Sequence, residues 1–446
     1  MRDHCLAPSR SAGITETYAG KYGRLFPELE PLEAEEALLL GLGGSGGLCD
    51  GSEGESEDEG VEAAGWPFFG QFVAHDITAD RSPLQLHAEV ESIRNFRTPR
   101  ANLECVYSAG QASPYLFQRD DPAKFLIGLD GDGRPVDLPR NQEGIALVGD
   151  ARNDVHAVVA QLHLALLRVH NGIVDRMRED GAGEGDLFAE ARQATTWHYQ
   201  WLIVEDYLPR VVGRPLVDEL LRDGRRYYRP DGEPFIPFEF ADAAYRFGHG
   251  QIRNSYQVHA GSGPVPLFPD LMGFRPIEPE SAIDWAFFFD LPGRPAPQRV
   301  RRMDGRLPAS LIGLPLAITG AVEEEAYHSL AGRDLQRGQA IGLPSGESVA
   351  RRMGIEPLSP DEVGLGPTGW QTETPLWYYV LQEAAAVAGG ARLGPVGGRI
   401  VAEVLLGIVD RDPESYRAVD PGWSPTLPAA TERFGIGDLL VFATAT

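Results

Sequence analysis

Apolar residues recur every three to four positions along several stretches of the chain, and the longest stretch covers residues 153–177. This spacing places the apolar side chains on one face of a helix. The side chains on that face are Val155, Val158, Val159, Leu162, Leu166, Leu167, Ile173 and Val174. The pattern predicts a long buried helix over residues 153–177.

Shorter periodic stretches predict further helices, separated by segments rich in proline and glycine. The predicted ranges are 31–42, 187–212 with a break at Pro209, 241–256, 307–314, 346–352, 375–388 and 396–409. Alternating strand patterns are sparse. We therefore expect a mainly α fold with long irregular loops and little β structure.

One segment differs in composition, because residues 44–60 are rich in glycine and acidic residues and lack apolar periodicity. Such a segment buries too little apolar surface to offset the entropy of ordering. We expect a flexible surface loop there, within a single domain that spans residues 1–446.

The chain carries 65 acidic and 40 basic residues, a formal net charge of −25. Phosphate binding needs a basic face, so this charge argues against a nucleic-acid partner. Cys5, Cys49 and Cys105 are too few and too scattered for a disulfide framework. The sequence shows no secretory signal and no run of about 18 apolar residues. A cytoplasmic protein without a membrane span is expected.

The hexapeptide Gln71-Phe-Val-Ala-His75-Asp76 places an imidazole beside a carboxylate. On a helix, neighbouring residues diverge by about 100°, whereas residues four apart share one face. Gln71 and His75 can therefore line one pocket while Asp76 points behind it.

A second histidine, His249, lies between two glycines in the sequence Ala244-Tyr-Arg-Phe-Gly-His-Gly250. Glycine costs about 1 kcal/mol against alanine inside a helix, so a flat group lying against the backbone would explain both glycines. One pocket histidine and one glycine-flanked histidine together suggest haem.

His156, His163 and His170 follow one another at seven-residue spacing on the predicted long helix. Residues seven apart are separated by about 10.5 Å along the helix axis, whereas zinc–nitrogen bonds measure about 2.0–2.1 Å. We interpret these three as packing or surface histidines rather than as metal ligands.

Five motifs, in this order, resemble those of the animal-type haem peroxidases of the peroxidase–cyclooxygenase superfamily, and most closely those of its bacterial members. They are Gln71-Phe-x-x-His75-Asp76, Gly149-Asp-x-Arg152, Leu162-His-x-x-x-Leu-Arg168-x-His170-Asn171, Arg246-Phe-Gly-His249, and Leu335-Gln-Arg337-Gly with Gly342-Leu-Pro. The resemblance runs from about residue 20 to about residue 440 and implies one large helical haem-peroxidase domain.

On one side of the haem, the resemblance implies a catalytic group of three residues. His75 would take a proton from hydrogen peroxide and return it to the leaving oxygen. Arg152 would stabilise the charge that develops on that oxygen, because its guanidinium stays protonated. Gln71 would line the same pocket.

On the other side, the resemblance makes His249 the ligand of the haem iron. Arg246 and Arg337 would pair with the haem propionates. Asp334 departs from the family pattern, in which an asparagine accepts the hydrogen bond from the second nitrogen of the ligand. A carboxylate there should make His249 a stronger donor to iron and lower the iron potential.

The resemblance also implies calcium behind the first histidine, in an all-oxygen shell of the kind that calcium prefers. The matching residues are Asp76, Thr98, the carbonyl of Arg100, Asn102 and Glu104. Asn102 stands where aspartate is usual, and Glu104 where aspartate or serine is usual. We therefore expect calcium to bind weakly.

Ala74 and Val155 occupy the positions at which mammalian members carry carboxylates esterified to the haem. Neither side chain can form an ester, so the resemblance implies a noncovalent haem b and weaker chloride oxidation than in the mammalian relatives. An ester through Asp154 is a less favoured alternative.

The implied function is a haem peroxidase that cleaves hydrogen peroxide and oxidises an organic, phenolic or aromatic donor or a halide. A tailoring oxidase acting on one metabolite fits the sequence as well. A fatty-acid dioxygenase is less favoured, because Arg246 stands where it needs a radical tyrosine. A noncatalytic haem-binding protein is disfavoured by the intact His75, Arg152 and Gln71.

Overall fold

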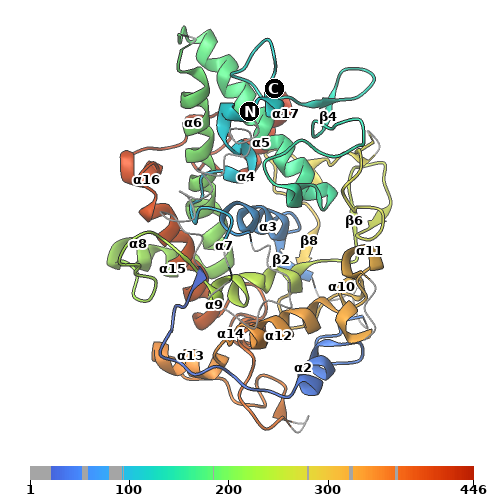
Figure 1. Ribbon diagram of the computed structural model, residues 1–446, viewed down its shortest axis with the longest axis vertical. Coiled ribbons are helices and arrows are strands. Elements are labelled where there is room, and N and C mark those ends of the chain that lie inside the picture. The colour runs from blue at the N-terminus through green and yellow to red at the C-terminus, as the bar shows by residue number, and fades with distance from the viewer. Residues whose placement is uncertain are drawn as a thin grey trace, which may run out of the picture.

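The computed structural model describes residues 22–52, 59–79, 93, 95–183, 185–278, 281–320, 325–366 and 370–446. Helices dominate these ranges, and the strands form four separate two-stranded sheets (Figure 1). The mainly α fold with little β structure is therefore confirmed.

The α-helices are α2 (Glu36–Gly43), α3 (Trp66–Ile77), α4 (Glu104–Tyr107), α5 (Ala157–Glu179), α6 (Leu187–Trp201), α7 (Leu208–Val212), α8 (Arg214–Asp223), α9 (Phe238–Ala241), α10 (Ala309–Ile312), α11 (Leu316–Thr319), α12 (Leu330–Ala340), α13 (Gly346–Met353), α14 (Leu376–Ala388), α15 (Pro395–Arg411), α16 (Tyr416–Val419) and α17 (Ile436–Ala445). Two further segments bear on the site, the 3-10 helices η5 (Ala151–Asp154) and η7 (Ala244–Gln251).

Each sheet joins two short strands. The parallel pair is β1 (Tyr22–Gly23) with β5 (Ile236–Pro237). The antiparallel pairs are β2 (Glu59–Ala63) with β8 (Arg299–Arg301), β3 (Gly128–Leu129) with β4 (Pro135–Asp137), and β6 (Ser255–Gln257) with β7 (Pro264–Pro266).

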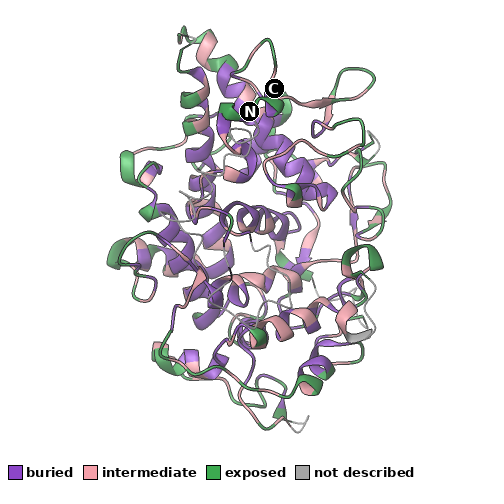
Figure 2. Cartoon of the chain, viewed as in Figure 1, coloured by how far each residue is buried: buried purple, intermediate pink, exposed green. Residues whose placement is uncertain are grey.

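Helix α3 lies in the middle of the molecule and packs against α5, which in turn packs against α6 and α17 (Figure 1). Below it, η7 packs against α3, α14 and α15, and α12 packs against α2 and α14. Figure 2 shows the central helices almost wholly buried and the exposed residues confined to the periphery. The two histidines singled out by the sequence therefore lie on two elements, α3 and η7, that meet in the interior.

The predicted long helix is present as α5, beginning at Ala157 after the 3-10 turn η5. By length and composition α5 could cross a membrane, but 89% of its apolar 18-residue stretch is buried inside the protein. Its apolar character is therefore accounted for by core packing, as the three-to-four spacing predicted.

Two helix predictions need correction. Residues 187–212 remain helical past Pro209, because the irregularity is taken up by a π-helical stretch at Leu202–Tyr207 directly before α7. The predicted helix over residues 241–256 is wrong, since the 3-10 helix η7 ends at Gln251 and β6 follows at Ser255. Two glycines beside His249 weaken regular α-helix there.

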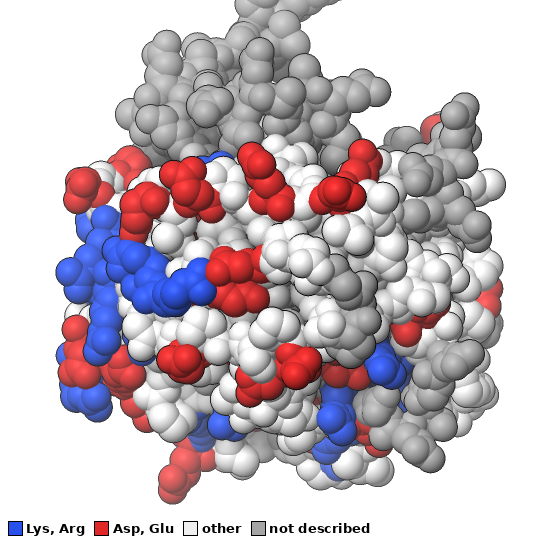
Figure 3. Space-filling model, turned by 90° about the horizontal axis from the view of Figure 1, so that it is seen from below, with Lys and Arg blue, Asp and Glu red and all other residues white. Residues whose placement is uncertain are grey.

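The segment predicted as a flexible acidic loop lies partly outside the described residues, at positions 53–58. The flanking parts are ordered into the fold, since Cys49 is buried, Asp50 bridges to Leu307, and strand β2 begins at Glu59. Elsewhere, acidic side chains are spread over the face seen in Figure 3, where the largest group of basic side chains lies at the left edge and smaller groups lie toward the bottom.

Candidate functional site

Helix α3 has a single face that is not fully buried. Ten of its residues are buried, and the two exceptions are Gln71 and Ala74. His75, at 8% exposure, borders the same face. The structure thus places Gln71, Ala74 and His75 together along one side of a core helix, while Asp76 is fully buried behind them. This is the arrangement that the spacing predicted.

The His75 ring is held from behind by an amide. Its Nδ1 lies 2.9 Å from the Oδ1 of Asn153, a buried residue of η5. Burial, and then the positive charge of Arg152, lower the pKa of His75 to about 4. His75 is therefore neutral near pH 7 and can accept a proton.

Arg152 is anchored to the C-terminal end of α3. Its Nη2 donates to the carbonyls of His75 at 3.0 Å and of Thr78 at 2.5 Å, which satisfies carbonyl oxygens that a helix end leaves open. Asp150 binds the same guanidinium through Nε at 3.1 Å and Nη2 at 2.8 Å. The cation is thus fixed beside His75.

Asp150 also binds a second arginine, Arg97, at 2.5 Å and 3.1 Å. Burial acts to raise the pKa of the Asp150 carboxyl, but Arg152 and Arg97 hold it well below its usual value. The sequence analysis missed both Asp150 and Arg97. The motif Gly149-Asp-x-Arg152 contained the only signal, an acid two residues before the predicted cation.

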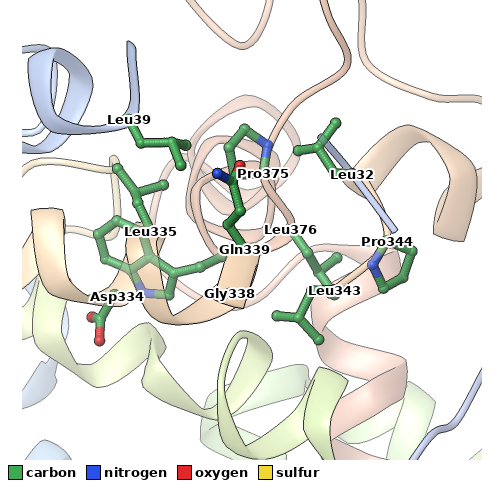
Figure 4. Close-up of a pocket in the computed structure, with 11 residues that line it drawn as sticks. Leu32, Leu39, Asp334, Leu335, Gly338, Gln339, Leu343, Pro344, Pro375 and Leu376 are labelled. Carbon is green, nitrogen blue, oxygen red and sulfur yellow. The ribbon is translucent and has the colours of Figure 1, made fainter. Parts of the chain in front are cut away.

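The second histidine, His249, is backed by Asp334 of α12, with its Nδ1 2.6 Å from Oδ2. This leaves its Nε2 to face the other way, as an iron ligand requires. Burial acts to raise the pKa of the Asp334 carboxyl, but His249 and Arg246 hold it below its usual value. Asp334 lies at the edge of a small apolar pocket, and its carboxylate points away from the leucines that line it (Figure 4).

Arg246 and Arg337, predicted to bind propionates, are placed in an ion-pair cluster. Arg246 donates to Asp334 at 2.8 Å, to Asp242 at 3.0 Å and to the Ala241 carbonyl at 3.0 Å. Arg337 donates to Asp242 through Nε. All three guanidinium nitrogens of Arg246 thus have protein acceptors. Arg246 therefore also positions Asp334, a role that the sequence did not predict. The propionate roles stay a prediction.

An alanine side chain would fit without overlap at either glycine beside His249. A Cβ on Gly248 would lie 3.9 Å from Pro67, and one on Gly250 would lie 3.5 Å from Leu381, which are ordinary van der Waals contacts. Protein packing therefore does not require either glycine. A flat group lying against the backbone stays the prediction that would explain both.

The predicted calcium loop wraps around Asp76, whose carboxylate accepts from the N–H groups of Leu103 at 2.9 Å and Cys105 at 3.2 Å. Thr98 Oγ1 lies 2.7 Å from Glu104 Oε2 and 3.5 Å from the Asn102 amide. Carboxylate, hydroxyl and amide oxygens are ligands of the kind that calcium takes. The described residues nevertheless contain no group of three or more His, Cys, Asp or Glu that could hold a metal ion.

Two neighbours limit this oxygen site. The Arg97 guanidinium stands 3.4 Å from Glu104 and offsets part of its charge. The Arg100 side chain points to Glu233 and Asp412, at 3.4 Å and 3.5 Å. Calcium at this loop stays a prediction.

Three positions bear on an ester bond to haem, namely Ala74, Val155 and Asp154. Ala74 lies on the open face of α3, and Val155 follows η5. Asp154 is held by Arg140 through two contacts of 2.7 Å and is buried. With that carboxylate engaged, no acidic group takes the place of the missing ester carboxylates at these three positions.

The three histidines at seven-residue spacing are all buried and each has a structural partner. His156 caps α5 by accepting from Val158 N–H at 3.2 Å. His163 bonds Asn153 at 2.9 Å, and His170 bonds Tyr107 at 2.9 Å. Their interpretation as packing residues is confirmed.

Comparison with known proteins gives a consistent result. The model of the family described as animal haem peroxidase matches residues 85–268. The chain is 30% identical over 251 residues to the peroxidasin homolog pxn-2 of Caenorhabditis elegans, covering 53% of this chain and 17% of that protein. It is 27% identical over 209 residues to thyroid peroxidase of Canis lupus familiaris, covering 44% and 21%. The chain thus matches about a fifth of these relatives' length.

Solved structures share the fold. Peroxidase A from Dictyostelium discoideum superposes with a TM-score of 0.66 at 14% identity, covering 96% of each chain. The fatty acid alpha-dioxygenase of Oryza sativa superposes with a TM-score of 0.56 at 15% identity, covering 80% of this chain and 70% of that one.

Proposed function

Since the chain belongs to the peroxidase–cyclooxygenase superfamily, we propose that it is a haem-dependent peroxidase that reduces hydrogen peroxide and oxidises a small organic donor. One observation carries the proposal. A neutral histidine on α3 lies beside an arginine that is anchored to the carbonyls at the end of that helix, and a second histidine on η7 is backed by a carboxylate.

The haem would be held by His249, whose Nε2 is free to bind iron, with Arg246 and Arg337 next to it for the propionates. Bound there, haem b supplies the redox chemistry that no side chain can. The two glycines beside His249 support this position, because protein packing does not require a glycine at either place. Alanine at position 74 and valine at position 155 support noncovalent binding.

The three residues on the His75 side of the haem have separate roles in cleaving peroxide. His75, neutral at pH 7, takes a proton from one oxygen of hydrogen peroxide and delivers it to the other oxygen, which leaves as water. Arg152 places a permanent positive charge beside that departing oxygen. Gln71, one turn earlier on the same face, orders peroxide or water by hydrogen bonds.

A phenolic or aromatic donor is the proposed substrate class, or a halide, and a tailoring oxidase for one metabolite is the alternative. The two differ in breadth, since a general defence enzyme should turn over many phenolic dyes and a tailoring enzyme few. A fatty-acid dioxygenase is less well supported. Arg246 occupies the radical position, and the nearby Tyr245 is partly buried and stacked on Phe240 at 4.5 Å.

We also propose calcium at the loop of residues 98–104, a single haem domain over residues 1–446, and a cytoplasmic location. Asp76 supports calcium, because burial raises its pKa to about 6 and no described residue forms a salt bridge with it. Cys49 and Cys105, both buried and unpaired, support a reducing compartment. Fractionation of the native cell would test the location.

Absorption spectroscopy tests the function. Purified protein should show a Soret band that changes on adding peroxide, and acid–acetone should extract all of the pigment. His75→Ala should keep the haem and lose the peroxide reaction, whereas His249→Ala should lose or loosen the haem. His328→Ala, on the partly exposed turn before α12, serves as the control and should do neither. Protein that cannot be loaded with haem would end the proposal.

A further inference from the structure

Asn153 directly follows Arg152 in η5, ahead of α5, and it is fully buried. Its amide bridges two buried imidazoles. The Oδ1 lies 2.9 Å from His75 Nδ1, and the Nδ2 lies 2.9 Å from His163 Nδ1. The role proposed for His75 explains Arg152 beside it but does not use this bridge.

The polarity of the amide decides where the protons of both rings are. A carbonyl oxygen can only accept, so His75 must carry its proton on Nδ1. An amide nitrogen can only donate, so His163 Nδ1 must be unprotonated. His75 Nε2 is consequently left with a lone pair. The opposite amide orientation would leave His75 with a proton on Nε2 and no base to offer.

We propose that Asn153 is a positioning residue for the peroxide reaction, fixing His75 in the tautomer whose Nε2 is the base, with His163 holding the amide in that orientation. The inference rests on the proposed function. Asn153 follows the Gly149-Asp-x-Arg152 motif and is not part of it, and His163, although it lies in the Leu162-His motif, was interpreted only as a packing residue.

The surroundings of His75 already contain the charges that act on its ring. Arg152 and Arg97 are the cations and Asp150 the anion whose charges act on His75. Both oxygens of Asp150 are already occupied by the two arginines. Asn153 therefore orients the ring without adding a charge to a buried site.

The first experiment observes the tautomer directly. Holoprotein labelled with ¹⁵N-histidine is reduced and bound to carbon monoxide, which makes the iron diamagnetic, and the His75 ring is identified by its absence in His75→Ala. The His75 signals should show a proton on Nδ1 and none on Nε2. A proton on Nε2 would overturn the inference even if no Asn153 variant folds.

The second experiment measures the rate of the peroxide reaction by stopped flow. Asn153→Leu keeps the volume but removes the bridge, and should slow the reaction by about 100-fold or more, the range for losing a positioned acid–base group. Asn153→Asp keeps an acceptor for His75 Nδ1, and should recover at least about tenfold of that loss. Haem content should stay at the wild-type level.

Asn171→Leu is the matched control. Its amide also bridges two groups, the backbone N–H and carbonyl of Phe125, but it lies on α5 away from His75. It should leave the rate unchanged per haem. An unchanged rate in Asn153→Leu, or a greater loss in Asn153→Asp, would overturn the inference. A wild-type protein that takes up haem but ignores peroxide would instead overturn the proposed function.

Discussion

The Oδ2 of Asp334 accepts from His249 at 2.6 Å while its Oδ1 accepts from Arg246 at 2.8 Å. One buried carboxylate is thus shared by an imidazole and a guanidinium. The sequence predicted that Asp334 would make His249 a strong donor. The structure adds that Arg246 takes up part of the same negative charge, which moderates that effect.

Replacing Asp334 by asparagine should raise the reduction potential of the haem iron. A neutral amide accepts a weaker hydrogen bond than a carboxylate, so His249 donates less to ferric iron. A shift of about 59 mV would correspond to a tenfold change in a one-electron equilibrium. Spectroelectrochemical titration of the holoprotein measures it.

Asp242→Asn is the control, because Asp242 contacts Arg246 and Arg337 but not His249. It should move the potential less than Asp334→Asn. Equal shifts in the two variants would mean that total charge, rather than the bond to His249, sets the potential.

Replacing Asp150 by asparagine should destabilise the protein by about 3 kcal/mol at pH 7, because it removes the shared anion of Arg97 and Arg152. The pKa of Asp150 is lowered in the folded state, so its stabilisation is complete above the unfolded value of about 3.9 and is lost as pH falls below it. Urea unfolding should show the same difference in unfolding free energy between wild type and Asp150→Asn at pH 7 and pH 5, and a smaller difference at pH 3.5.

The exposed pair Arg222 and Asp223 offers a comparison. Asp223→Asn should change stability little at any pH, because water screens an exposed ion pair. A stability difference between wild type and Asp150→Asn that grew on acidification would contradict the lowered pKa of Asp150.

Two helical glycines with opposite surroundings test how tightly α3 is packed. A Cβ on Gly70 would overlap the hydroxyl of Tyr207, whereas one on Gly41 of α2 would meet nothing within 4 Å. Gly70→Ala should cost about 1–3 kcal/mol by overpacking. Gly41→Ala should be neutral or stabilise by up to about 1 kcal/mol. Thermal unfolding decides, and a tolerated Gly70→Ala would show that α3 can shift.

Calcium should raise the melting temperature of the protein at millimolar concentrations, and a chelator should reverse the rise. Asn102→Asp should strengthen the effect, because it restores a charge to the oxygen site around Asp76. Magnesium is the control cation and should do less, since it demands a stricter geometry. If neither wild type nor Asn102→Asp responds to calcium, the loop is not a calcium site.

Local periodicity predicted α5 and the open face of α3, because both follow from helical geometry alone. It missed α12, whose sequence has two glycines and few apolar residues, although Ser329 caps it by accepting from Gly332 N–H. A serine before the segment was the available signal.

The contacts that hold the site could not be read from spacing. Arg97 and Asp150 are 53 residues apart in sequence, and His75 and Asn153 are 78 apart. Such pairs exist only once the chain folds back on itself, and no local pattern distinguishes a buried asparagine that orients a histidine from one in a turn.

Trp377 of α14 is buried, and its indole N–H donates to the carbonyl of Arg246 at 3.4 Å, directly against the segment that carries His249. A haem bound to His249 would absorb the light that this indole emits. The fold therefore contains its own optical probe of cofactor loading. Titrating haem into the protein should quench tryptophan fluorescence in proportion to occupancy, and Trp377→Phe should weaken the response.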